Sequence, residues 1–193
     1  FDHHVFVLAS DGDIQEGVSA EACSLAGHQE LGNLVVLYDA NRISIEDDTN
    51  VAFNEDVLKR YEAYGWDTTR VDWRNGGEYQ EDVQGLYDAI VAATKVTDKP
   101  SIIALNTIIG WPAPTKQNTG GVHGSALGED EVAATKKILG FDPEKSFQIE
   151  PEIFEHVREV GERGKQERAQ WEKSFADWRE AHPDKAALYD RIK

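Results

Sequence analysis

The sequence predicts an α/β protein with a doubly wound, mostly parallel sheet. Four short apolar stretches rich in β-branched residues are typical of buried parallel strands: Val5–Ala9, Leu34–Asp39, Thr68–Asp72 and Ser101–Thr107. Helical patterns separate them, which gives the order β-α-β-α-β-α-β. Ligands of such sheets bind beyond the carboxyl ends of the strands, so the residues that follow each strand are the candidates for a site.

Three helices are expected between these strands. From Gln15 to Leu31 apolar residues recur at helical spacing, and Gly32 fits a C-cap. The segments Asn54–Tyr64 and Glu78–Thr97 have the same character, and a Pro-containing stop closes the second. These helices provide the crossovers that a parallel sheet requires.

Two further segments follow the last strand. Residues 110–128 are rich in glycine and proline and too long for a simple connector, so we interpret them as an active-site loop. Beyond residue 150 the composition becomes charged and helical, with an aromatic stripe, Trp171, Phe175 and Trp178, that we assign to packing. We therefore expect one domain over residues 1–150 and a helical tail over residues 151–193.

Composition excludes several classes of partner. The 193 residues include 36 acidic and 20 basic side chains, a net charge of −16, which repels nucleic acid and anionic membranes. No apolar run is long enough to span a bilayer, and one cysteine, Cys23, cannot form an intrachain disulfide, so we expect a reducing cytoplasm. The chain begins inside a strand pattern and reads as part of something longer.

Polar residues follow the first two strands. Asp11 ends the first strand and Asn41 follows the next, and a right-handed crossover brings such ends to the same edge of the sheet. A carboxylate, an amide oxygen and a backbone carbonyl suit Mg²⁺ that also binds phosphate oxygens and water. Gly12 would let a diphosphate approach the backbone at the start of the following helix. The alternative is that these are ordinary turn residues.

The sequence also resembles the transketolase family, of bacterial type, over essentially the whole chain. The resemblance is carried, in order, by Ser10–Gly17, Ser24–Gly27, Leu31–Leu34, Tyr38–Ile45, Glu62–Trp66, Val96–Ser101, Thr107–Gly110 and His123–Gly128. A Gly-Asp-Gly followed some thirty residues later by Asn is the general thiamine-diphosphate fingerprint. Here Ser10 replaces the first glycine, which costs little if the turn needs no positive φ.

The resemblance implies a thiamine-diphosphate-binding fold that is incomplete at its N-terminal side. It makes Asp11, Asn41 and the main-chain carbonyl of Ile43 the ligands of Mg²⁺, or of Ca²⁺ or Mn²⁺. It assigns Gly12, Asn41, Ile43 and His123 to the cofactor, and His123 also to substrate binding and proton transfer.

Two glutamates on the first helix receive a different role from the resemblance. Glu16 and Glu21 match acids at the subunit interface of a homodimer, linked to a glutamate that activates the cofactor and lies in another segment. We take Glu16 as a second catalytic candidate. Its position in the first helical turn is also explained by the helix dipole alone.

The implied activity is transfer of a two-carbon ketol group from a ketose phosphate to an aldose phosphate, as in the pentose phosphate pathway. The expected partners are sugar phosphates, the remaining transketolase domains and a second copy of the chain, and the isolated segment should be inactive. The loop over residues 110–128 should be mobile until cofactor binds. Two alternatives stay open: a sibling enzyme, such as a dihydroxyacetone or deoxyxylulose-phosphate synthase or a pyruvate dehydrogenase first component, and a non-catalytic module.

Overall fold

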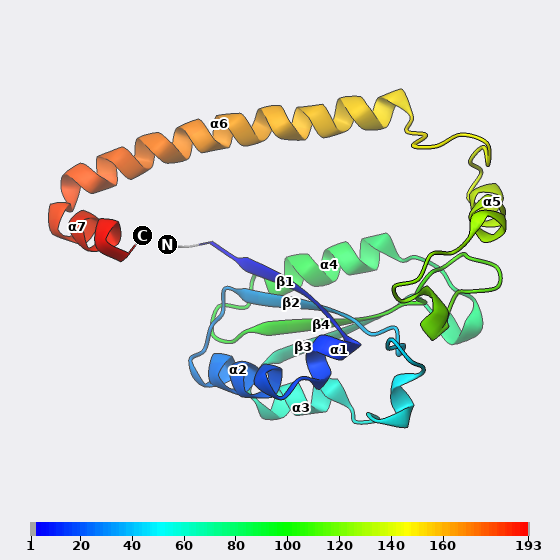
Figure 1. Cartoon of the computed structure of the whole chain (residues 1–193). Helices are drawn as coiled ribbons and strands as arrows, with labels where there is room; N and C mark the ends of the chain where they lie inside the picture. Colours follow the sequence, from blue (N-terminus) through cyan, green and yellow to red (C-terminus); the bar gives the residue numbers. More distant parts are fainter. Residues whose placement is uncertain (1–2, 193) are drawn as a thin grey trace. The chain divides into compact units, whose positions relative to one another are not determined.

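The computed structural model describes residues 3–192 (Figure 1). The chain forms two compact units, Phe1–Pro143 and Glu144–Lys193, and each is considered by itself. The first contains the sheet and every candidate site residue. The second is helical and begins a few residues before the expected start of the tail.

Within the described residues the first unit has one sheet of four parallel strands. They are β1 (Val5–Ser10), β2 (Leu34–Asp39), β3 (Asp67–Asp72) and β4 (Ser101–Asn106), in the order β1-β2-β4-β3. All pairs are parallel, with Ser10 opposite Asp39 and Asp72 opposite Asn106. The predicted fold class and all four strands are confirmed, with strand ends shifted by at most one residue.

The helices differ more from expectation. The first crossover is not one helix from Gln15 but two, α1 (Asp11–Gln15) and α2 (Gly17–His28). They are divided at Glu16, whose φ of −65° and ψ of 134° are extended, so Glu16 joins two helices and does not lie in a first turn. The other two are α3 (Val57–Ala63) and α4 (Val83–Ala93), shorter than predicted because Asp56 and Asp82 cap their N-termini.

The predicted C-cap at Gly32 is wrong. Helix α2 ends at His28, and the residue with positive φ beyond it is Glu30, at 53°. Gly32 serves a packing role, because a Cβ there would lie 2.2 Å from the carbonyl oxygen of Thr97. A glycine is needed where the turn before β2 touches the turn before β4.

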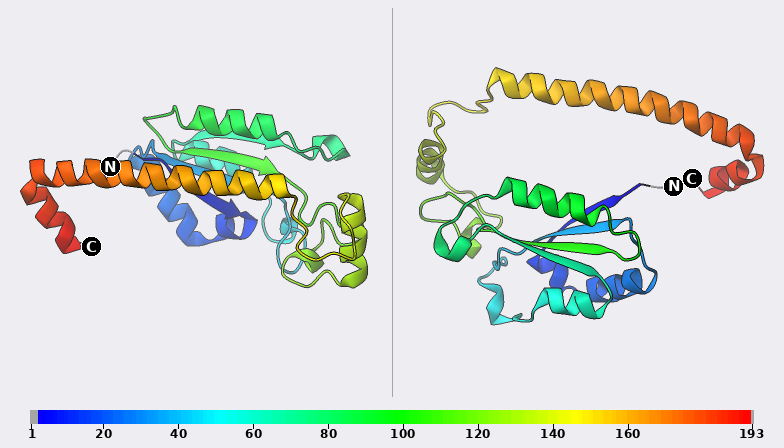
Figure 2. Two further views of the ribbon diagram at one scale, coloured as in Figure 1. Left: turned by 90° about the horizontal axis from the view of Figure 1, so that it is seen from above. Right: turned by 180° about the vertical axis from the view of Figure 1, so that it is seen from behind.

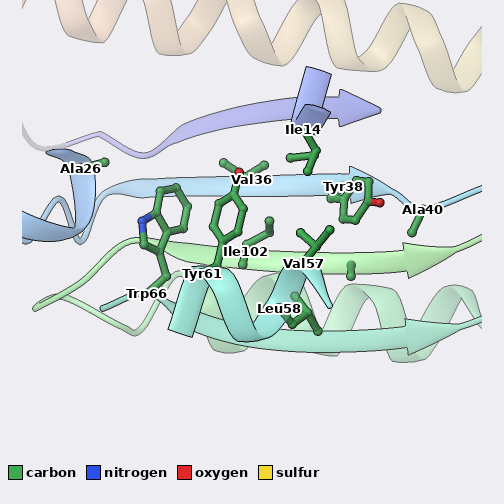
Figure 3. Close-up of a cluster of buried hydrophobic side chains, with 11 residues drawn as sticks. Ile14, Ala26, Val36, Tyr38, Ala40, Val57, Leu58, Tyr61, Trp66 and Ile102 are labelled. Atoms are coloured by element: carbon green, nitrogen blue, oxygen red, sulfur yellow. The ribbon is translucent and has the colours of Figure 1, made fainter. Parts of the chain in front are cut away.

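Two apolar clusters cover the two faces of the sheet. On one face Val36 and Tyr38 of β2 and Ile102 of β4 pack against α1, α2 and α3, where Tyr61 is 1% exposed (Figure 3). On the other, alternate residues of β2, β3 and β4 pack against α4, which Figure 2 shows on the side opposite α2 and α3. This alternation follows from the period of two along a strand.

The expectation that Val5–Ala9 is a buried strand is not met in this chain. Strand β1 has a neighbour, β2, along one edge, and its side chains are exposed, with Phe6 at 51% and Leu8 at 82%. The apolar pattern of β1 is that of an interior strand, whereas the described residues cover it on one side. Among the described residues β1 is an edge strand, and of its apolar side chains Ala9 packs against the buried core, while those from Val5 to Leu8 are exposed on both faces of the sheet.

The remaining elements lie after β4 or in short turns. Three 3₁₀ turns, η1 (Thr49–Val51), η2 (Asn75–Gly77) and η3 (Gly120–Val122), border the carboxyl edge of the sheet, and α5 (Glu129–Ile138) was not predicted. The second unit contains α6 (Pro151–Ala181) and α7 (Pro183–Ile192). No helix in residues 3–192 is long and apolar enough to cross a membrane.

The aromatic stripe of the tail packs as predicted. Phe175 stacks between Trp171 and Trp178, with ring centroids 4.9 and 5.6 Å apart, and meets Tyr189 of α7 edge-on at 5.4 Å. Arg179 of α6 and Asp190 of α7 form a two-pronged ion pair beside it. These contacts hold α7 against the end of α6.

Candidate active site at the carboxyl edge of the sheet

Asp11 and Asn41 meet at the carboxyl ends of β1 and β2. Both side chains are buried, at 3% and 6% exposure. Asp11 Oδ2 accepts a hydrogen bond from the Arg42 amide at 2.8 Å, and Asn41 Oδ1 accepts one from the Ile43 amide at 2.9 Å. The two acceptors therefore bind consecutive N–H groups of one turn. The convergence predicted from the strand ends is confirmed.

The Asp11 carboxyl is buried, which disfavours its charged form. Burial raises the pKa of the Asp11 carboxyl, the hydrogen bonds from Tyr38 and the Arg42 amide oppose that rise, and the charge of Asp39 adds to it. The Tyr38 hydroxyl donates to Asp11 Oδ1 at 2.6 Å, and burial and that contact raise the pKa of Tyr38. Among the described residues no basic side chain hydrogen-bonds to Asp11, although its oxygens retain lone pairs.

Ile43 was expected to be a buried apolar anchor and to offer its carbonyl to a metal, and the structure bears on the first of these roles. Its side chain is 6% exposed, a buried apolar anchor. Its backbone forms an antiparallel bridge with Asp48 through hydrogen bonds of the flanking residues, so the Ile43 carbonyl is not one of the bridge acceptors. Arg42, between the two candidate ligands, has a φ of 67°, a conformation that surrounding contacts must hold.

The candidate ligand set has few charges. Among the described residues no group of three or more His, Cys, Asp or Glu side chains could hold a metal ion. The arrangement instead offers one carboxylate, one amide oxygen and one main-chain carbonyl. Oxygen donors of this kind suit Mg²⁺, Ca²⁺ or Mn²⁺ and do not suit softer metals.

The serine in the fingerprint is accommodated without strain. Ser10 has a φ of −109°, so its turn needs no positive φ, as expected. The Ser10 amide and hydroxyl both donate to Asp13 Oδ2 at 2.8 Å, and these bonds lower the pKa of Asp13. Around Gly12 a Cβ would meet only the Ser10 hydroxyl within 4 Å, at 3.9 Å, so the backbone there is open to approach.

The glycine-rich loop, residues 110–128, lies against the turn that carries Asn41 and Ile43. A Cβ on Gly120 would be 2.9 Å from the Glu46 carbonyl oxygen and 3.0 Å from that of Ile45. His123 follows three residues later at the end of η3, where its amide donates to the Gly120 carbonyl at 3.1 Å. Its ring is exposed and makes no hydrogen bond within residues 3–192.

The loop is clamped on both sides of His123. The Glu131 carboxylate accepts hydrogen bonds from the Thr115 amide at 2.8 Å, its hydroxyl at 2.7 Å and the Lys116 amide at 3.0 Å, which lower the pKa of Glu131. Lys116 Nζ then donates to the carbonyls of Ala126 and Leu127. The predicted mobility is therefore expected in residues 120–125 rather than along the whole loop.

Sequence reasoning missed the residues that tie this edge together. Arg74, two residues beyond β3, donates to the carbonyls of Asn41 and Thr107 and to Asn118 Oδ1. The Asp39 carboxylate, at the end of β2, accepts hydrogen bonds from the side-chain nitrogen Nδ2 of Asn41 and from the Thr107 hydroxyl. Arg74 lies just beyond the end of β3, so reading the ends of the later strands would have found it. Asp39 ends β2, and its position beside Asn41 in the sequence was the signal that could have found it.

The two glutamates of the first crossover lie apart from these contacts. Glu16 and Glu21 are exposed, and neither side chain hydrogen-bonds within the described residues. Helix α2 also exposes Val18 at 69% and Leu25 at 59%. The structure does not group Glu16 with Asp11 and Asn41, so its catalytic assignment stays a prediction.

Known proteins resemble this chain over its full length. The family model for "Transketolase, thiamine diphosphate binding domain" matches residues 1–193. Transketolase of Mycobacterium tuberculosis is 54% identical over 192 residues, covering 100% of this chain and 27% of that protein. Transketolase 2 of Saccharomyces cerevisiae is 43% identical over 191 residues, covering 98% and 27%.

Solved structures agree with these sequences. A Pichia stipitis transketolase in complex with sedoheptulose 7-phosphate superposes with a TM-score of 0.87 at 39% identity, covering 98% of this chain and 27% of that one. Transketolase from Campylobacter jejuni gives a TM-score of 0.81 at 38% identity, covering 90% and 26%. The chain thus spans about a quarter of the length of these relatives. It belongs to the family of transketolase thiamine-diphosphate-binding domains.

Proposed function

We propose that this chain is the diphosphate- and metal-binding part of a transketolase that transfers a two-carbon ketol group from a ketose phosphate to an aldose phosphate. The observation that carries the proposal is the pair of buried oxygens, Asp11 Oδ2 and Asn41 Oδ1, on consecutive amides of one turn. Family membership supports the reaction class, and the geometry supports the location of the anchoring site.

The residues present fit a divalent cation and a diphosphate. Asp11, Asn41 and the Ile43 carbonyl would hold Mg²⁺, or Ca²⁺ or Mn²⁺, and a cation there would offset the cost of ionising Asp11 in a buried position. Gly12 offers open backbone toward the phosphates. A cation bound between protein and diphosphate also reconciles an anionic ligand with a chain of net charge −16.

His123 is the proposed proton-handling and substrate-contacting residue. When bound, thiamine diphosphate supplies the carbon centre that carries the two-carbon unit between sugars. The exposed His123 imidazole lies on a loop that packs against the turn carrying Asn41 and Ile43. It would donate a hydrogen bond from a ring nitrogen to substrate or cofactor oxygens and exchange a proton there. The Glu131 and Lys116 clamps would keep its loop at the edge of the sheet.

We also propose that the chain is part of a homodimer whose subunits carry additional domains. Exposed apolar residues on α2, with Glu16 and Glu21 nearby, fit a surface that a second copy of the chain covers. The 27% coverage of relatives fits additional domains that complete the substrate site. We also propose a cytoplasmic enzyme and expect no turnover from these 193 residues alone.

The test is a ketol-transfer assay on the intact protein with xylulose 5-phosphate and ribose 5-phosphate. Asp11→Ala and Asn41→Ala should abolish the increase in activity produced by Mg²⁺ and thiamine diphosphate. Glu46→Gln changes an exposed carboxylate on the same turn, and it should behave as wild type. Wild-type turnover of pyruvate instead of sugar phosphates, or full activity of the two Ala variants, would refute the proposal.

The inactivity of the segment needs its own experiment. Residues 1–193 are assayed under the same conditions, and folding is checked by circular dichroism for the helices and sheet seen here. A folded segment with turnover near that of the intact protein would contradict the proposed division of the active site between this chain and other parts.

A further inference from the structure

Arg74 joins three segments that are far apart in the sequence. It lies two residues beyond the end of β3, and it is half-buried. Its Nε donates to the Thr107 carbonyl at 2.7 Å, and its Nη2 donates to the Asn41 carbonyl at 3.0 Å and to Asn118 Oδ1 at 2.7 Å. The acceptors belong to the segments after β4 and β2 and to the glycine-rich loop. One guanidinium group therefore links two strand ends and that loop.

Two of these contacts are part of a closed ring of hydrogen bonds. Asn41 Nδ2 donates to Asp39 Oδ2 at 3.2 Å, and the Thr107 hydroxyl donates to Asp39 Oδ1. Arg74 closes the ring through the carbonyls of Asn41 and Thr107. Asn41 is thus held at its backbone and at its amide nitrogen, and its remaining polar atom, Oδ1, is directed to the Ile43 amide. The ring fixes which way the amide points.

We propose that Arg74 is a positioning residue that holds the side-chain oxygen of Asn41 in place for the metal and keeps the glycine-rich loop against the same edge of the sheet. The metal part of this inference rests on the proposed function. Arginine suits the role because its planar group presents several donors in fixed directions, which lysine does not. Partners that orient a metal ligand typically contribute about 10–100-fold to metal affinity.

Hydrogen exchange in the metal-free intact protein tests the positioning directly. The Ile43 amide is bonded to Asn41 Oδ1, so its exchange reports on that oxygen. Arg74→Ala should speed exchange in residues 41–48 and 115–119, and guanidinium ion at a non-denaturing concentration should restore it. Arg70→Ala removes an exposed arginine of β3, bonded to Asn106 at 3.3 Å, and should leave both segments unchanged. Unchanged exchange in Arg74→Ala would overturn the proposal.

A magnesium titration of ketol-transfer activity tests the effect on the metal. In Arg74→Ala the Mg²⁺ concentration for half-maximal activity should rise by about 10–100-fold, with kcat at saturating Mg²⁺ largely retained. Arg74→Lys should recover little of the loss. A fall in kcat at every Mg²⁺ concentration with an unchanged requirement would indicate general damage and overturn the metal part. If the wild type needs neither Mg²⁺ nor thiamine diphosphate, the proposed function fails, whereas the exchange experiment still decides the role of Arg74.

Discussion

Gly27 lies in α2 where the helix touches the turn between α3 and β3. A Cβ at this position would be 1.9 Å from the carbonyl oxygen of Tyr64 and 3.2 Å from the Trp66 ring. Ordinary contact begins near 3.4 Å, so Gly27→Ala requires the helix or the turn to move by about 1.5 Å. The atom in the way is backbone, which cannot rotate aside.

The free energy by which Gly27→Ala destabilises the packing of α2 is the sum of three contributions. Overpacking of this kind costs about 1–3 kcal/mol. The displacement also strains the hydrogen bond from Trp66 Nε1 to the Cys23 carbonyl, 2.8 Å long, which is worth about 1 kcal/mol. Alanine gains about 1 kcal/mol over glycine in a helix, which offsets part of the cost. We expect Gly27→Ala to destabilise the packing of α2 by about 1–3 kcal/mol.

Hydrogen exchange of the α2 amides measures this effect. A loss of this size should speed exchange by roughly 5- to 150-fold where it proceeds through opening of the helix. Gly161→Ala, in α6, has nothing within 4 Å of its new methyl group and should slow local exchange through helix propensity alone. Slower exchange in both variants would show that the close approach at Gly27 can relax and would refute the reasoning.

Three further predictions concern the carboxyl edge of the sheet. Burial raises the pKa of Asp11 above its ordinary value of 3.8, so ionising this carboxyl destabilises the fold; the cost is absent below pH 3.8, grows as pH rises above that value and is complete once pH exceeds the raised pKa. Asp11→Asn should therefore raise the unfolding temperature of the metal-free protein at about pH 8, less so toward about pH 4, and abolish stabilisation by Mg²⁺ with thiamine diphosphate. An equal unfolding temperature at about pH 8 would contradict this. Gly120→Ala places a methyl group 2.9 Å from the Glu46 carbonyl oxygen and should raise the thiamine diphosphate concentration for half-maximal activity. Gly124→Ala places its methyl group in open space and should not; equal behaviour of the two variants would count against the contact. Glu131→Gln removes the charge that holds two loop amides and should speed their hydrogen exchange, while Glu129→Gln on the same helix should not. Because hydrogen bonds lower the pKa of Glu131, the stability that its carboxylate gives the loop is fully present above its ordinary pKa of 4.5 and is lost as pH falls through the lowered value. Loop exchange that changes with neither the variant nor the pH would refute the clamp.

The local sequence was sufficient to predict the strands and insufficient to predict where the helices begin and end. The four strands were predictable because each is a short run containing apolar or β-branched residues, a pattern that needs no tertiary information, whereas the exposure of β1 was not predictable in this way. Helix ends were predicted less well. The helix after β1 begins at once at Asp11 and breaks at Glu16, whose extended backbone no residue pattern in the segment indicated.

Glycines illustrate the same division. Gly32 looks like a helix cap in the sequence, yet its purpose is a close approach to Thr97, a residue that is distant along the chain. Gly120 likewise serves the contact with Glu46. Such roles depend on which segments meet, and a single sequence does not state that.

By itself the sequence determined the sheet, the pairing of Asp11 with Asn41 at one edge, and the family resemblance. These rest on local pattern and on the handedness of a crossover, which are nearly fixed by the chirality of the chain. Only the tertiary structure decided that Arg74 and Asp39 hold Asn41, and that Glu131 clamps the loop of His123. The hydrogen bonds of Arg74 join residues 33 positions apart and those of Glu131 join residues 15 and 16 positions apart. Such bonds depend on side-chain directions that packing sets, so no local pattern predicts them.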